Sequence, residues 1–112
     1  MPNSNKTTGT LFETAVLKVL QAAGLRAVKP RQTTALDTGD IHVGEDVLVQ
    51  AKDWANLSGA LDAGTKGAQV QARRAGRPFG VAVVKRRGRH AREAYVVMPL
   101  HVFTALLNSR DK

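Results

Sequence analysis

Apolar residues recur along this chain at two spacings, and each spacing predicts a different kind of element. From residue 11 to residue 23 they return every three or four positions, as on the buried face of an amphipathic helix, and Gly24 then ends the pattern. Similar helical patterns begin at Asn56 or Ser58 and again after Pro99. The spacing therefore predicts three helices.

The second and third of these helices are expected to bury defined faces. The second carries several glycines, which weaken a helix but let its backbone approach a sheet closely. The predicted buried side of the second helix, which should end near residue 75, consists of Leu57, Ala60, Leu61, Gly64, Ala68, Ala72 and Ala75, and that of the third of Leu100, Phe103, Leu106 and Leu107.

Between the helices, apolar residues alternate with polar ones or run without interruption, and both patterns are typical of strands. The predicted strands cover residues 25–34, 41–43, 47–51, 79–84 and 94–98. Pro30 interrupts the first strand, which suits an edge position, and the unbroken run at 79–84 suits a central strand covered on both faces. The helix between the third and fourth strands implies that these two strands are parallel.

These elements predict one α/β domain with a mixed sheet flanked by helices, in the order αβββαββα. The chain has 112 residues, of which 43% are hydrophobic, and this is enough for a single modest core. We expect the domain to span residues 9–112. Residues 1–8 are polar and are expected to form a flexible arm, with Thr7 or Thr8 capping the first helix.

The charge of the chain indicates the kind of partner. The formal net charge of +8 favours a polyanion such as nucleic acid over a surface that is basic only for solubility. The chain has no cysteine, which excludes disulfides, thiolate zinc sites and a cysteine nucleophile. It shows no signal peptide and no apolar run long enough to span a bilayer, so we expect a soluble cytoplasmic protein with no membrane partner.

The hairpin predicted around residues 44–46 carries the candidate chemistry. Asp40 opens its first strand, and Gln50 and Lys52 share one face of its second strand because side chains alternate along a strand. The hairpin can therefore bring a carboxylate, an amide oxygen and an ammonium group together at one sheet edge. Such a group is typical of metal-dependent phosphodiester hydrolysis.

These residues resemble the signature of the PD-(D/E)XK nuclease superfamily. G-D-I at residues 39–41 is followed, after a turn and an apolar strand, by Q-A-K at residues 50–52. T-G-T-L-F-E at residues 8–13 is similar to the start of the first helix in archaeal-type Holliday junction resolvases. The resemblance covers nearly the whole chain and is closest to small resolvase-like proteins of bacteriophages, with V-V-K-R-R-G at residues 83–88. It implies a restriction-endonuclease-like core.

The resemblance also implies a metal site. The catalytic residues would be Glu13, Asp40, Gln50 and Lys52, and the first three would bind Mg²⁺, with Mn²⁺ as a substitute. Lys52 would contact the scissile phosphate or orient the attacking water. Gln50 stands where the family usually has Asp or Glu, either as a natural neutral ligand or as a substitution that traps an inactive complex. Glu13 could instead serve only to stabilise the start of its helix.

Basic residues outside this site would hold the DNA backbone through phosphate contacts, which give affinity without sequence information. The predicted DNA-binding residues are Lys85, Arg86, Arg87, Arg89 and Arg92 in a loop between two strands, Arg73, Arg74 and Arg77 near the end of the second helix, and, by the resemblance, Gln69 on that helix. The loop could instead be a solvated hairpin tip, and Gln69 a solvated helix position. No base-reading motif is evident, which favours a nuclease selective for DNA structure.

Three functions are compatible with these residues. The first is an endonuclease that resolves four-way junctions or cuts other branched DNA, acting as a homodimer because symmetric incision needs two sites. The second is another nuclease of the same fold, such as a nickase, a flap or repair nuclease, or a restriction-type enzyme. The third is a non-catalytic DNA-binding module that has lost activity through Gln50. A phage-encoded protein of this kind would act in the cytoplasm of the host cell.

Overall fold

The computed structural model describes residues 4–30, 40–53 and 56–110, and for residues 4–10 and Asp40 it describes the backbone alone. Its elements, in chain order, are α1 (Ser4–Ala22), β1 (Ala27–Val28), β2 (Asp40–Val43), β3 (Val47–Lys52), α2 (Leu57–Arg74), β4 (Phe79–Val84), the 3₁₀ turn η1 (Ala91–Glu93), β5 (Tyr95–Val97) and α3 (Leu100–Arg110). This is the predicted order αβββαββα, with η1 added before the last strand. None of the helices in this part of the chain is long and apolar enough to cross a membrane.

The protein has a mixed α/β fold whose strands form one five-stranded sheet in the order β1-β2-β3-β4-β5. β3 and β4 are parallel, as predicted, and the other neighbouring pairs are antiparallel. α2 makes the connection between the two parallel strands. β4 is buried along its whole length, which agrees with its internal place in the sheet and its unbroken apolar sequence.

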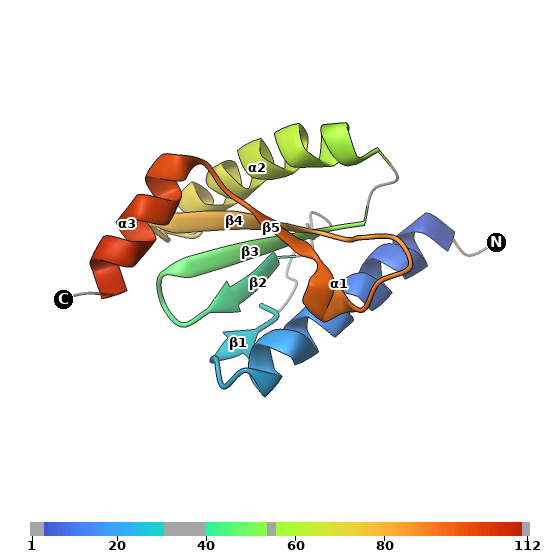
Figure 1. Cartoon of the computed structure of the whole chain (residues 1–112). Coiled ribbons are helices and arrows are strands. Elements are labelled where there is room, and N and C mark those ends of the chain that lie inside the picture. Colours follow the sequence, from blue (N-terminus) through green and yellow to red (C-terminus); the bar gives the residue numbers. More distant parts are fainter. Residues whose placement is uncertain (1–3, 31–39, 54–55, 111–112) are drawn as a thin grey trace.

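Helices cover both faces of the sheet, with α1 on one side and α2 on the other (Figure 1). α1 contributes Phe12 and Val16 to a buried cluster that includes Val49 of β3. α2 contributes Ala60 to a second buried cluster that includes Val84 of β4. The sheet therefore separates two hydrophobic cores, and Val47, Val49 and Ala51 of β3 belong to the core beneath α1.

Two helix ends follow the signals read from the sequence. After α1, Gly24 has a φ angle of 89°, and its N–H donates to the carbonyl oxygen of Gln21 at 3.0 Å as part of a Schellman motif. Before α2, the side chain of Asn56 accepts a hydrogen bond from the Gly59 N–H at 3.1 Å. Local capping chemistry thus fixes where α1 ends and where α2 begins.

Two elements differ from the prediction by more than two residues at an end, whereas β3 and β5 differ by one residue at an end. α1 begins at Ser4, so residues 4–8 of the predicted arm are helical and neither of the predicted threonines caps the helix. These small and polar residues include no proline, so nothing in them stops the helix from extending. β1 has only two residues instead of filling residues 25–34, because Pro30 has no N–H to donate to a strand ladder. Residues 31–34 lie outside the described residues.

The buried face of α2 is shorter than predicted. Leu57 is 47% exposed, and Ala75 lies beyond the helix and is exposed. An 18-residue helix is about 27 Å long. A six-residue strand reaches only about 20 Å. The ends of α2 therefore extend past the sheet, and the residues that remain buried are Ala60, Gly64, Ala68 and Ala72.

α3 buries a different face from the predicted one. Val102 is its buried residue, whereas Leu100 is 75% exposed and Phe103 is 45% exposed. Leu106 packs against the same cluster as α1, and Leu107 is half-buried. Apolar residues occupy several sides of this short helix, so their spacing alone does not select the face that packs.

Candidate functional site

The β2–β3 hairpin forms in a register that places the predicted catalytic positions. Asp40 lies directly opposite Gln50, and directly opposite residues of an antiparallel pair belong to the same face of the sheet. Lys52 comes two residues after Gln50 and therefore belongs to that face too. The register assigns these three positions to one face, at the end of the hairpin remote from its turn.

α2 covers the face that carries Gln50 and Lys52. Gln50 is only 2% exposed, and its amide lies against Gly67, where an added Cβ atom would be 2.8 Å from Gln50 Oε1. One turn earlier, a Cβ atom added to Gly64 would be 3.4 Å from Lys52 Cγ. Gly64 and Gly67 therefore leave the space in which these two side chains lie. The sequence predicted only that glycines would let the backbone of this helix approach the sheet.

Glu13 belongs to α1, which packs on the opposite face of the sheet from α2. Its Oε1 atom lies 3.1 Å from Nζ of Lys29, just after β1, and the Glu13 side chain is 13% exposed. Neither the sequence pattern nor the resemblance indicated this ion pair. Glu13 thus has a cationic partner on its own side of the sheet, and its role as a metal ligand stays a prediction.

Asp53 and Lys85 form a second ion pair that sequence reasoning missed. Nζ of Lys85 lies 3.5 Å from Oδ2 of Asp53, and the Lys85 N–H donates to the Lys52 carbonyl oxygen at 2.9 Å. The cause is the parallel register of β3 and β4, which places Lys52 beside Val84. The basic loop that follows β4 therefore begins next to Lys52.

This basic loop, residues 85–92, is held by contacts with Glu93 and Tyr95, where the chain enters β5. The guanidinium carbon of Arg86 lies 4.6 Å from the centre of the Tyr95 ring, and Nη1 of Arg86 donates to the Glu93 carbonyl oxygen at 3.4 Å. Arg89 pairs with the Glu93 carboxylate at 3.4 Å. The prediction of a connection between two antiparallel strands is confirmed, with η1 inside it. The exposed basic residues of the loop are Arg87, Arg89 and Arg92.

The remaining predicted DNA-binding arginines lie at the other end of the sheet. Arg77 donates to the carbonyl oxygens of Gly44 at 2.9 Å and Val47 at 3.4 Å, so it holds the β2–β3 turn. Arg73 and Arg74 are exposed in the last turn of α2, where basic side chains stabilise a helix. The length of β3, roughly 20 Å, separates this end from Lys52. The predicted DNA-binding residues with basic side chains therefore lie in two groups, one at each end of the sheet.

The side chain of Gln69 forms a hydrogen bond with the backbone of β4. Its Nε2 atom donates to the carbonyl oxygen of Gly80 at 2.7 Å. Because Gly80 has no side chain, the backbone of α2 at Ala68 can pack directly over β4. This bond ties α2 to the beginning of β4, and a role of Gln69 in DNA binding stays a prediction.

The described side chains do not assemble a complete metal site. Among them, no group of three carboxylates or histidines is close enough to hold a metal ion. The carboxylate of Asp40 lies outside this description, and Gln50, a neutral oxygen donor, is covered by α2. A carboxylate and an amide oxygen are donors that Mg²⁺ accepts. Asp40 and Gln50 therefore fit this metal in kind, provided that the Gln50 amide leaves the space beside Gly67.

Comparisons with protein-family models, with curated proteins and with solved structures found no match. The fold that the structure shows is the mixed α/β sheet with helices on both faces. Its function is therefore inferred from the residues and the geometry described above.

Proposed function

We propose that this protein is a Mg²⁺-dependent DNA endonuclease that cuts branched DNA in the manner of a Holliday junction resolvase. The observation that carries the proposal is the hairpin register, which assigns Asp40, Gln50 and Lys52 to one face at one end of the sheet. The element order and the helices on both faces agree with a restriction-endonuclease-like core, and this agreement supports the same proposal.

Lys52 would act on the phosphate in this proposal. It is half-buried beneath α2 near Gly64, so packing restricts the stem of its side chain. An ammonium group held in this way would bind an oxygen of the scissile phosphate and stabilise the negative charge that develops in the transition state.

Asp40 would supply the carboxylate that holds Mg²⁺, with Gln50 as a neutral neighbour. The bound metal would polarise the phosphate and lower the pKa of an attacking water. Gln50 contributes no charge, so the site would hold the metal less tightly than a site with a second carboxylate.

The position of the basic loop supports DNA as the substrate. The loop begins beside Lys52, so phosphate contacts and the candidate chemistry lie at the same end of the sheet. Phosphate contacts select for the path of the backbone rather than for sequence, which suits an enzyme that recognises branched structure. Two copies of the chain would supply the two sites that symmetric incision of a junction requires.

A non-catalytic DNA-binding protein is the second candidate function, and the burial of Gln50 favours it. A neutral side chain that is 2% exposed beneath a helix makes a weak metal ligand. In this case the basic loop would bind branched DNA. The sheet face that carries Gln50 and Lys52 would serve only as a packing surface for α2.

Cleavage assays on a four-way junction, a flap and a linear duplex, each with Mg²⁺ and with Mn²⁺, distinguish these functions. We expect paired incisions in the junction and little cutting of the linear duplex. Equal cutting of all three substrates would favour a nuclease of another type. Binding of the junction without cutting, in the natural chain and in Gln50→Glu, would favour the non-catalytic function, and absence of binding would contradict both.

A further inference from the structure

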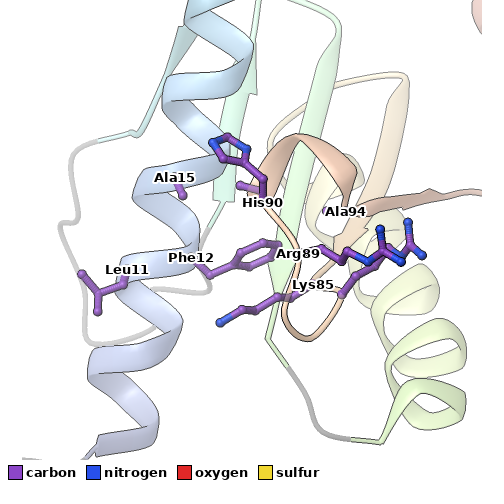
Figure 2. Close-up of a pocket in the computed structure, with 9 residues that line it drawn as sticks. Leu11, Phe12, Ala15, Lys85, Arg89, His90 and Ala94 are labelled. Carbon is purple, nitrogen blue, oxygen red and sulfur yellow. The ribbon is translucent and has the colours of Figure 1, made fainter.

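A pocket of ≈ 190 Å³ lies between the middle of α1 and the basic loop (Figure 2). Sequence analysis did not find it, because its two walls are far apart in the chain and meet only in the folded protein. The lining residues are Leu11, Phe12 and Ala15 from α1, and Lys85, Arg86, Arg89, His90, Ala91 and Ala94 from the segment after β4.

The pocket combines an apolar floor with a cationic rim. Phe12 is 4% exposed, and Figure 2 shows its ring extending from α1 toward the loop. Ala15, Ala91 and Ala94 add half-buried methyl groups to this surface. The remaining loop residues of the lining are three cations and a histidine, and none of the lining residues is acidic. Lys85 and Arg89 pair with Asp53 and Glu93, which lie outside the lining, so a bound phosphate would share these two cations with the carboxylates. The pocket therefore suits a ligand that joins an apolar part to a negative charge.

Hydrogen bonds within the loop fix part of this rim. Nδ1 of His90 accepts a hydrogen bond from the Arg92 N–H at 3.1 Å. A neutral histidine that accepts at Nδ1 carries its proton at Nε2, so the other side of the ring is a donor. Arg86 is held by its contact with the Tyr95 ring. The rim thus presents oriented donors as well as positive charge.

We propose that this pocket binds one unpaired nucleotide of a DNA strand, with its base against the apolar lining that Phe12 shares with the neighbouring alanines and its phosphate at Lys85 and Arg89. The volume is below the roughly 300–1,000 Å³ of pockets for drug-sized ligands, and this favours a single base. Bases stack on aromatic surfaces with little regard for sequence, and basic side chains hold the adjoining phosphate. The inference rests on the proposed DNA-binding function, but it does not depend on cleavage.

The place of the pocket explains why an unpaired nucleotide would be useful there. Lys85 lines the pocket, and its N–H donates to the Lys52 carbonyl oxygen. A nucleotide held at Lys85 would therefore lie close to the proposed catalytic end of the sheet. Fully paired duplex presents no free base to this pocket, whereas a branch point can, so the pocket would select the substrate by its structure.

Binding without metal tests the proposal, because cleavage is then excluded. Three probes are compared: a duplex with one unpaired adenosine, the same duplex with an abasic residue at that position, and the fully paired duplex. We expect the unpaired adenosine to bind roughly 5- to 150-fold more tightly than the abasic residue. Equal affinities for these two would overturn the pocket proposal while leaving DNA binding intact. Failure of all three to bind would overturn the proposed function itself.

Two variants assign any base preference to this pocket. Ala15→Leu fills it, and Leu11→Ala removes part of its wall at a residue that is 67% exposed and therefore dispensable for folding. Both should bring the affinity ratio close to one and leave affinity for the abasic duplex unchanged. Ala63→Leu and Leu57→Ala change exposed residues of α2 in the same way and should keep the full ratio.

Two further outcomes would count against this pocket. If Leu11→Ala and a folded Ala15→Leu both keep the preference, the base binds elsewhere and the proposal is wrong. Titration with deoxyadenosine monophosphate alone is the second control. The free nucleotide could bind in a way that Ala15→Leu abolishes, while the duplex with an unpaired adenosine shows no preference over the abasic one. That result would mean that the pocket takes a free nucleotide and would overturn the proposal of a strand nucleotide.

Discussion

Gly67 of α2 lies directly over the side chain of Gln50 in β3. A Cβ atom at position 67 would be 2.8 Å from Gln50 Oε1, which is closer than such atoms pack in proteins. The absence of a side chain at Gly67 therefore allows the Gln50 amide to lie between the sheet and the helix. The position of a candidate metal ligand is thus controlled by a residue outside the hairpin that carries it.

Gly67→Ala should show how tightly this amide is held. Alanine raises helix stability by about 1 kcal/mol over glycine. At position 67 this gain should be offset, because the Gln50 amide must move and a buried polar group that loses its hydrogen bonds costs about 1–3 kcal/mol. Gly59→Ala is the matched control, since its Cβ atom would meet only the Asn56 side chain, at 3.4 Å or more. Denaturant unfolding should show a gain for Gly59→Ala and none for Gly67→Ala, and equal gains would mean that the amide moves freely.

Gln50→Glu should make stability depend on metal. The substitution places a negative charge at a position that is 2% exposed and adds no positive charge to compensate it. We therefore expect the free energy of unfolding to fall by about 1–3 kcal/mol or more without metal. Mg²⁺ should restore stability, because a ligand bound only by the folded state stabilises it. Cleavage at limiting metal should also become faster. Gln71→Glu, at a half-buried position of α2, is the control. Loss of stability that metal does not restore would show that position 50 is not a ligand.

The hairpin, the end of α1 at Gly24 and the Asn56 cap of α2 could be predicted from the sequence because their causes are local. Alternation along β3 correctly places Val47, Val49 and Ala51 in the core beneath α1 and assigns Gln50 and Lys52 to the other face. The same reasoning could not show that α2 buries Gln50, because the depth of that side chain depends on how closely the helix packs.

The features that sequence reasoning missed depend on contacts between distant parts of the chain. The ion pair of Glu13 with Lys29 requires the end of β1 to lie beside α1. The separation of Arg73 from the basic loop follows from the direction of the crossover helix, which no charge pattern reveals. The exposure of Leu100 arises because α3 has apolar residues on several sides and only one of them meets the sheet.

Lys52→Ala should separate catalysis from binding. The proposed chemistry depends on this one ammonium group, whereas the chain carries a formal net charge of +8 for holding DNA. We expect the variant to bind the junction with nearly unchanged affinity and to lose at least 100-fold in cleavage rate, in line with the roughly 10²–10³-fold effect of removing one donor to a transition-state charge. Lys66→Ala, on an exposed part of α2, is the control. If Lys52→Ala lost binding and cleavage to the same extent, Lys52 would only contact a phosphate and would have no separate role in catalysis.

The two groups of arginines should differ in how they affect the salt dependence of DNA binding. Each phosphate contact that is lost lowers the slope of log K against log salt by about 0.9. The double variant of Arg87 and Arg89 to alanine should therefore flatten the slope clearly. The double variant of Arg73 and Arg74, about one strand length away, removes the same charge and should flatten it less. Identical slopes for both variants would mean that DNA contacts both ends of the sheet equally.

Self-association should use exposed apolar residues of β5 and α3. Val96 pairs with Val83 of the α1-side core and is 58% exposed, while Leu100 and Phe103 lie three residues apart on the exposed side of α3. β5 is also an edge strand, whose backbone can pair with a second copy.

Sedimentation of the natural chain should therefore show a homodimer. Phe103→Glu should shift it to the monomer, whereas Leu25→Glu, at a residue of similar exposure elsewhere, should not. A monomer both alone and on a junction would favour a nickase or the non-catalytic function.

The parallel pairing of β3 with β4 has a consequence for the order in which the protein folds. β2 and β3 are joined by a short turn and can pair as a local hairpin, whereas β3 and β4 are separated by the whole of α2. Pairing between distant segments has a larger entropic cost and forms more slowly. The hairpin should therefore exist, with Gln50 still in water, before β4 joins it. The candidate site would then be completed last. It would form when α2 packs onto the sheet and its glycines contact a hairpin that is already in place.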